Sequence, residues 1–429
     1  AINELATSES GNAITASVIH DGGGISLGGA TTDAGFDADA SLEFNIEQTS
    51  RSNGSDASAS STVTESVAVE ADSQLQSGGD TSITADQNVI VEQNAHSING
   101  ASTTASNGGN QVGIELGTQE AGGQVQLVVN NFLGGEAEAT SVLATASTEE
   151  IQNYLAGLEA ESLNSGSGIS SEADTSLAFS GNSVSTEDNA TSRGAVNYVY
   201  GVDADSTTGN TVNFDASAST SLQQLAETIA GDAQAISELG EQASLAITTL
   251  LSSGDANLIS DALASLVGNA NSVDGTAESR SQLSALLGLD SETIEIEGDA
   301  ELLANLGLTS SNDASSLTGN AIASTNAGTV EGFSVDQLDA EGEITLDSNI
   351  DADLNLLASS IDGTADAELT VDELSALNGV LDSDSDSALT LKSDMSVSVE
   401  SSSFSDDSSA SFNANQQSAA SGAEAVEDS

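Results

Sequence analysis

Apolar and polar residues alternate without a break in the stretch "FDADASLEFNIEQ", residues 36–48. Its apolar members are Phe36, Ala38, Ala40, Leu42, Phe44 and Ile46. Because successive side chains of a strand point to opposite faces, this pattern predicts a strand with one buried face. The stretch "LTLKSDMSVSVE", residues 389–400, shows the same alternation, and shorter segments of this kind lie at 112–116, 125–129, 196–202, 212–218 and 344–346.

Nothing in the composition interrupts such strands. The chain of 429 residues has no Pro, which cannot donate a hydrogen bond to a sheet ladder, so long uninterrupted arrays are favoured. It also has no Cys, which excludes disulfides and Cys-ligated zinc. Aromatic residues make up only 3% of the chain, so we expect a core of Val, Leu, Ile, Ala and Thr.

The charge balance limits the partners of the chain. It has 68 Asp and Glu against four Lys and Arg, a formal net charge of -64. So few cations exclude phosphate neutralisation, and we expect no nucleic-acid partner and no binding to an anionic membrane surface. Self-repulsion of this size must be screened by divalent cations or by high salt. This predicts an extracellular or cell-surface location.

The beginning of the chain and its hydropathy fit that location. The sequence starts at Ala1 without an apolar leader, and we expect that a signal peptide has been removed. No apolar run reaches the roughly 18 residues of a membrane span, so no membrane insertion is expected.

The middle of the chain shows helical spacing instead. Apolar residues three or four positions apart predict helices at 147–158, 221–250, 257–267, 281–287 and 300–306. We therefore predict a mainly β fold, either an elongated sandwich or an irregular β-solenoid, with an inserted all-α subdomain. The expected domains are a β region at 1–146, a short helix followed by a β region at 147–219, a helical subdomain at 220–310, and a β region at 311–429.

A short unit recurs through the chain: a small polar residue followed by Gly-Asn-x-[Ile/Val]. Copies are "SGNAI" at 10, "GGNQV" at 108, "SGNSV" at 180, "TGNTV" at 208 and "TGNAI" at 318, with irregular spacing. Together with the Ser, Ala, Thr and Asn content, this punctuation resembles the secreted β-strand-repeat surface proteins of bacteria. The resemblance implies an extracellular chain that acts in adhesion, surface layers or fibrous appendages, and it carries no catalytic residues.

No enzyme signature accompanies these patterns. Only two histidines occur, His20 and His96, and no G-x-S-x-G nucleophile elbow is present. The chain has no Trp and three Tyr, too few for an aromatic sugar-binding cleft. We predict that the protein is not an enzyme.

Calcium is the one cofactor that the sequence suggests. Residues 362–373, "DGTADAELTVDE", resemble the calcium loop of EF-hand and dockerin modules. The oxygen-bearing residues at its first, third, fifth, seventh and twelfth places are Asp362, Thr364, Asp366, Glu368 and Glu373. Ala367 stands where such loops have Gly, and no helix precedes the loop. The alternative is a solvated helix start, where acidic residues are favourable without a metal.

These observations favour a structural function. We expect a secreted subunit that forms homopolymers, such as a surface filament, sheath or tubular appendage, through strand-edge contacts and cation-bridged carboxylates. The segments "NAITASVI" at 12–19 and "MSVSVE" at 395–400 are the expected exchange strands. The alternative is a calcium-dependent adhesin or a component of a surface layer.

Overall fold

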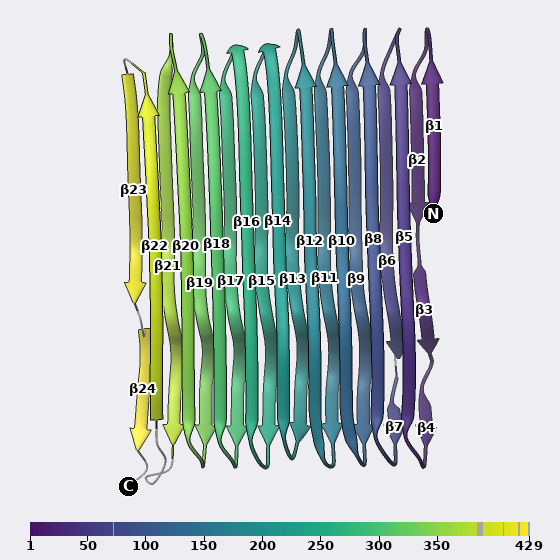
Figure 1. The fold of residues 1–429 in the computed structure, drawn as a ribbon, viewed down its shortest axis with the longest axis vertical. Coiled ribbons are helices and arrows are strands. Elements are labelled where there is room, and N and C mark those ends of the chain that lie inside the picture. Colours follow the sequence, from purple (N-terminus) through teal and green to yellow (C-terminus); the bar gives the residue numbers. More distant parts are fainter. Residues whose placement is uncertain (72, 384–388, 406, 419–420, 428–429) are drawn as a thin grey trace.

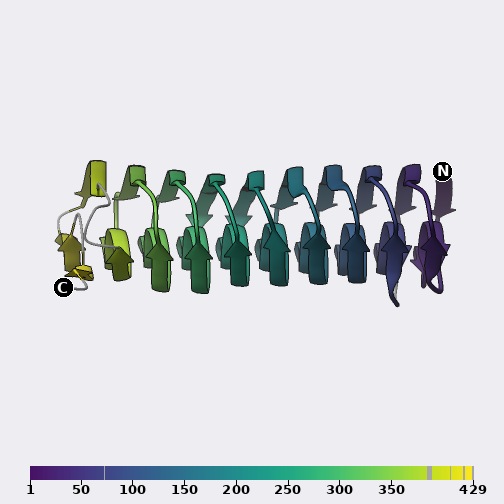
Figure 2. The same ribbon diagram turned by 90° about the horizontal axis from the view of Figure 1, so that it is seen from below.

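The chain winds as a β-solenoid with two flat sheets. The computed structural model describes residues 1–71, 73–383, 389–405, 407–418 and 421–427, which contain 24 strands and no helix. The chain passes from a strand of one sheet to a strand of the other and back, and each such pair makes one coil (Figure 1). Successive coils stack along a single axis, so the two sheets form two layers (Figure 2).

The two sheets are named sheet A and sheet B. Sheet A has the order β1 (Ile2–Ser8), β5 (Phe36–Ser52), β8 (Thr81–Ser97), β10 (Gln124–Ser141), β12 (Gly168–Ser185), β14 (Val212–Ala230), β16 (Ala256–Asp274), β18 (Ala300–Ser316), β20 (Ile344–Ser360), β22 (Leu389–Phe404). The main path of sheet B is β2 (Ala13–Ile19), β6 (Ala57–Ala71), β9 (Ser102–Ala121), β11 (Ala146–Ser165), β13 (Ala190–Gly209), β15 (Ala233–Ser252), β17 (Ala277–Ile296), β19 (Ala321–Ala340), β21 (Thr364–Ser383), β23 (Asp407–Ser418). Its short additional strands are β3 (Gly22–Leu27), β4 (Ala30–Thr32), β7 (Leu75–Ser77) and β24 (Ser421–Glu427).

Neighbouring strands are parallel and in a nearly constant register. Ile2 pairs with Ile46, Phe36 with Thr81, and Ile169 with Val212, which are 44, 45 and 43 positions apart. Each residue therefore lies beside its counterpart one coil further along, about 4.8 Å away. The solenoid has a fixed period, which the Gly-Asn copies did not reveal.

The core fills the space between the sheets. In β20 every second residue is buried, and the same alternation runs through the strands of sheet A. The mainly β prediction is thus confirmed: residues 36–46 lie in β5, and each shorter segment predicted as a strand lies within a strand.

The predicted all-α subdomain is wrong, because residues 220–310 continue both sheets from β14 to β18. In β15 the buried residues alternate normally from Ser237 to Leu239. The next buried residue after Leu239 is Gln242, three positions on, and the next after Ile247 is Leu250, again three positions on. Two steps of three residues within a strand imitate the spacing of a helix. The predicted helices at 147–158 and 281–287 lie in β11 and β17, which have the same irregularity.

The helices predicted at 257–267 and 300–306 fail for a different reason. In β16 the core-facing residues include Leu258, Ala262 and Leu266, which are four positions apart. A spacing of four fits one face of a helix, but because four is an even number it also fits one face of a strand. The burial alternates with period two, so both segments are strands.

A bend in the strands of sheet B explains the steps of three (Figure 1). The ladder between β11 and β13 passes over Gly157 and Gly201, which are not paired. At this level sheet B approaches sheet A so closely that a Cβ on Gly157 would lie 2.6 Å from the Thr175 hydroxyl of β12. The corresponding residue of every coil is small: Gly24, Ala68, Gly113, Gly157, Gly201, Ser244, Gly288, Gly332 and Ala376.

The turns that follow the sheet A strands from β5 to β20 are each held by a hydroxyl group. The Ser141 Oγ donates to the carbonyl oxygen of Gly100 (2.8 Å), and that of Ser316 donates to Gly275 (2.7 Å), one coil earlier in each case. The hydroxyl residues of this column are Ser8, Ser52, Ser97, Ser141, Ser185, Thr228, Ser272, Ser316 and Ser360. The hydroxyl column therefore connects each turn to the turn of the preceding coil.

Replacing Gly201 tests the close approach of the sheets. A Cβ there would lie 2.6 Å from the Ser244 carbonyl oxygen and 3.0 Å from that of Ser217. We expect Gly201→Val to lower the free energy of unfolding by about 3 kcal/mol in chemical denaturation, because the sheets must separate. Gly23→Val is the control, since nothing lies within 4 Å of its added Cβ. Equal losses in both variants would contradict the model of a tight bend.

Candidate functional site

The five residues predicted as calcium ligands lie along an extended segment. Asp362 is in the turn before β21, and the other four are inside that strand. Thr364 and Glu373 are nine residues apart, about 30 Å at the rise of a strand, whereas the ligands of one calcium ion each lie at about 2.4 Å from it. The structure therefore does not form the twelve-residue loop, and it does not bring the five residues together.

Several of these residues already have protein partners. Thr364 donates through its backbone N–H and its hydroxyl to the Asn320 side-chain oxygen (3.2 and 2.9 Å), and Asp366 accepts from the Ser409 hydroxyl. Among the described residues no group of three or more His, Asp and Glu side chains has the arrangement of a metal site. Calcium binding by any of Asp362, Thr364, Asp366, Glu368 and Glu373 stays a prediction, but in this extended segment the five do not form one shared site.

A shallow groove that the sequence did not indicate lies on the outer face of sheet B. The bend buries a small apolar cluster of Val67, Val112 and Ala156, which is separate from the main core. Tyr154 and Tyr200 cover this cluster, with ring centroids 5.7 Å apart. Tyr198 stacks on Tyr200 at 6.3 Å, so all three tyrosines of the chain meet here.

Carboxylates surround these tyrosines. The Tyr154 hydroxyl donates to Asp203 and that of Tyr200 to Glu241, each at 2.8 Å. Burial, followed by the charge of Asp203, raises the pKa of Glu159, and burial raises the pKa of Asp203 against the opposing hydrogen bond from Tyr154. A hollow of about 200 Å³ beside them is lined by Glu115, Leu116, Gly117, Glu159, Ala160, Glu161, Asp203 and Asp205. The groove is thus a strongly negative aromatic surface.

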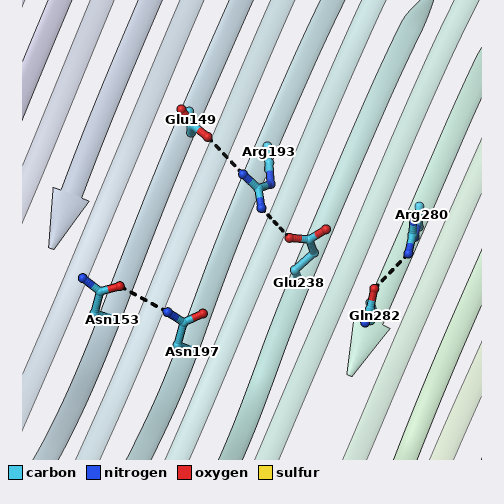
Figure 3. A network of polar contacts seen from close by, with 7 residues as sticks. All are labelled: Glu149, Asn153, Arg193, Asn197, Glu238, Arg280 and Gln282. Carbon is cyan, nitrogen blue, oxygen red and sulfur yellow. Dashed lines mark hydrogen bonds and ion pairs between the residues drawn. The ribbon is translucent and has the colours of Figure 1, made fainter. Parts of the chain in front are cut away.

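The few cations are placed between strands of acidic residues. Figure 3 shows Arg193 of β13 donating to Glu149 of β11 (3.0 Å) and to Glu238 of β15 (2.7 Å). These bonds raise the pKa of Arg193. In sheet A, Lys392 contacts Asp347 of the neighbouring strand at 3.3 Å. Each of these two cations therefore joins adjacent coils.

One carboxyl group is buried in the core. Glu150 of β11 is 1% exposed, and burial raises its pKa to about 8, with Gln224 opposing the shift and Glu136 adding to it. Gln224 is in β14, and its side chain fills the space left by two glycines of the coil between. A Cβ on Gly181 or Gly194 would lie 2.2 or 2.4 Å from the Gln224 amide group. Because Gly181 and Gly194 have no side chains, Glu150 and Gln224 can approach each other across the coil that lies between them.

The ends of the solenoid expose strand edges. β1 and β2 pair on one side only, and at the other end β22 pairs only with β20. The segments 12–19 and 395–400, which the sequence indicated for exchange between subunits, therefore both lie on edge strands among the described residues.

The last coil also leaves part of its inner face uncovered. Leu389, Leu391, Val397 and Val399 of β22 are 36, 48, 37 and 36% exposed. Their partners in β20 are Ile344, Leu346, Ala352 and Leu354, which are 0, 2, 2 and 1% exposed. A further coil stacked on β22 would bury these side chains as β22 buries those of β20.

Comparisons with known proteins add no identity. No family model matches the chain, and no curated protein or solved structure is significantly similar to it. Within the part of the chain that the structure describes, no helix has the length and the apolar character to cross a membrane.

The strand geometry leads to a test of the calcium prediction. We expect the rise in melting temperature on adding calcium to be the same in the wild-type protein and in Asp362→Asn/Glu373→Gln, because ligands about 30 Å apart cannot share an ion. Thermal unfolding with calcium and with chelator measures this. A loss of stability in the variant that is seen only with calcium would restore the specific site.

Ionisation of Glu150 gives a pH dependence of stability. Its pKa is about 8 in the folded state and 4.5 as the ordinary value, so the folded state binds more protons between these values. The free energy of unfolding should therefore fall as pH rises from 4.5 to 8. We expect Glu150→Gln to remove this component and to be more stable than the wild type by about 4 kcal/mol at pH 8. A wild-type pH profile from Glu150→Gln would contradict the assignment.

Proposed function

We propose that the protein is an extracellular structural subunit that assembles end to end into a bacterial surface filament, sheath or tubular appendage. The observation that carries this proposal is the uncovered inner face of β22, together with the one-sided pairing of β1 and β2 at the opposite end. Parallel strands at both ends can continue the same ladder in a second copy. Such a head-to-tail contact does not close on itself and therefore produces a filament.

The register of the two ends is compatible with this contact. Ile2 pairs with Ile46, and the column of residues that contains Ile46 continues coil by coil to Val399. Ile2 of a second copy, placed beside Val399, would extend this column without a change in period. In this register β1 of that copy covers β22 from Val399 onward, and Leu389, Leu391 and Val397 lie before the covered part. In sheet B, Ala13 of that copy would lie beside Ser408, because Ala13 pairs with Ala57 and the same column reaches Ser408.

Cations belong to the proposal because stacking adds charge. Each copy brings a formal charge of -64 to the growing filament. Carboxylates of adjacent coils already lie in register in the column Glu47, Glu92 and Glu136. Divalent cations that bridge or screen such columns lower the cost of adding a further copy.

An edge variant tests the assembly. We expect the purified protein to form filaments in calcium or in concentrated salt, and Val399→Asp to stay monomeric, because the new carboxylate would be buried between two coils. Ser398→Asp is the matched control, since it adds the same charge to the outer face of the same strand, where Ser398 is exposed. Electron microscopy with calcium, with sodium chloride and with chelator gives the measurement.

Each outcome of this experiment has a clear meaning. Monodisperse monomers of the wild-type protein under all conditions would refute the filament. Filaments of Val399→Asp equal to those of the control would show that the assembly uses another surface. A regular two-dimensional lattice would favour the alternative, a component of a surface layer.

A further inference from the structure

An apolar column runs along the edge of the solenoid where strands of sheet A turn toward sheet B. We call it the apolar ridge, and its members are Ile98, Val142, Thr186, Ile229, Val273, Leu317 and Ile361. They occupy seven consecutive coils: the backbone N–H of Leu317, for example, donates to Ser272 and that of Ile361 to Ser316, one coil earlier. Over six coil intervals the ridge is about 29 Å long.

The ridge is open to solvent. The exposed fractions of four members are 53% for Ile229, 37% for Val273, 42% for Leu317 and 65% for Ile361. These side chains point away from the core, so packing of the core does not require apolar residues at these positions. A hollow of about 540 Å³ accompanies its second half, and its walls include Thr186, Ile229, Val273, Leu317 and Ile361. The row of four exposed apolar side chains from Ile229 to Ile361 is typical of an interaction site.

The surroundings of the ridge are unusually poor in charge. Of the fourteen residues that line the hollow, only Glu227 is charged. By contrast, four of the eleven residues around the hollow at Glu47 and Glu92 are carboxylates, as are five of the eight in the groove near Tyr154. In a chain with a net charge of -64, a second polyanion can therefore approach this hollow at a lower electrostatic cost than either of those two.

We propose that the apolar ridge is the lateral contact between two copies of this chain, which lie side by side and point in the same direction. A partner must present apolar groups at intervals of about 4.8 Å to cover the whole ridge. A second copy of the chain carries the same ridge and therefore has the same spacing. A two-fold axis parallel to the solenoid places each ridge residue against the same residue of the other copy.

The flanking charges favour this parallel arrangement. On its strand side the ridge is flanked by the residues two positions before its members, and on its turn side by the residues one position after them. The two-fold axis places the strand side of one copy against the turn side of the other. Glu227 then faces Ala230, Asn271 faces Asp274, Val184 faces Glu187, and Ser359 faces Asp362, so no carboxylate meets another. An antiparallel pair centred on Ile229 would place Glu227 against Glu227 and Glu187 against Asp274. Like charges in such positions oppose association.

Single cysteines test the contact, because the natural chain has none. In 1 M sodium chloride, where the Debye length is about 3 Å, we expect Ile98→Cys, Ile229→Cys and Ile361→Cys each to form a disulfide-linked dimer on mild oxidation. A mixture of Ile98→Cys and Ile361→Cys should give homodimers and no mixed dimer, because these positions would be about 29 Å apart. Leu263→Cys is the control: Leu263 is also 53% exposed, but lies on the outer face of sheet A.

Two results would overturn the proposal. A mixed dimer of Ile98→Cys with Ile361→Cys in excess of the homodimers would mean an antiparallel pair. Equal cross-linking of Leu263→Cys would mean unspecific collision. Sedimentation provides an independent measurement, in which Leu317→Asp should weaken dimerisation by at least about tenfold, whereas Leu263→Asp should not. Lateral dimers of Val399→Asp would separate this contact from end-to-end assembly, and a wild-type protein that is monomeric in all salts would refute it.

Discussion

In-register parallel stacking is the constraint on which the rest of the molecule depends. Because the period is nearly constant, every outward side chain lies about 4.8 Å from its counterpart in the next coil. In a chain of charge -64 this rule would produce columns of carboxylates. One column of sheet A instead alternates acids with neutral donors: Asn130 donates to Asp86, Ser217 to Asp174 and Asn305 to Asp261, each at 2.7 Å. Acidity is thus compatible with the ladder when neighbours share hydrogen bonds.

The same constraint shows where the electrostatic cost remains. Glu115, Glu159 and Asp203 follow one another in three consecutive strands of sheet B. Burial raises the pKa of the last two; the charge of Asp203 adds to the rise at Glu159, those of Asp205 and Glu241 add to it at Asp203, and the hydrogen bond from the Tyr154 hydroxyl to Asp203 opposes it. Screening by cations stabilises the fold most at such places.

The sequence predicted a strand at residues 36–46, where apolar and polar residues alternate without exception, but not at 257–267 or 300–306, where apolar residues four positions apart fit a helix as well as a strand. It misled where sheet B bends: the bend shifts the buried face by one residue, and the steps from Leu239 to Gln242 and from Ile247 to Leu250 imitate a helix. The signal that could have prevented the error is the column of small residues that includes Gly157, which recurs every 43–45 positions. The groove of tyrosines depends on the same bend, so local sequence patterns could not predict it either.

The two proposed contacts differ in the charge that must be buried when they form. On β1 the side chain of Glu4 occupies an inward position, where it accepts a hydrogen bond from Gln48 at 3.0 Å. An inward carboxylate on an edge strand opposes strand addition, because a stacked coil would bury its charge. End-to-end growth must therefore compensate the charge of Glu4 with a cation, whereas no ridge residue carries a charge. Lateral pairing should respond to screening alone, and elongation should respond in addition to the ion that reaches Glu4.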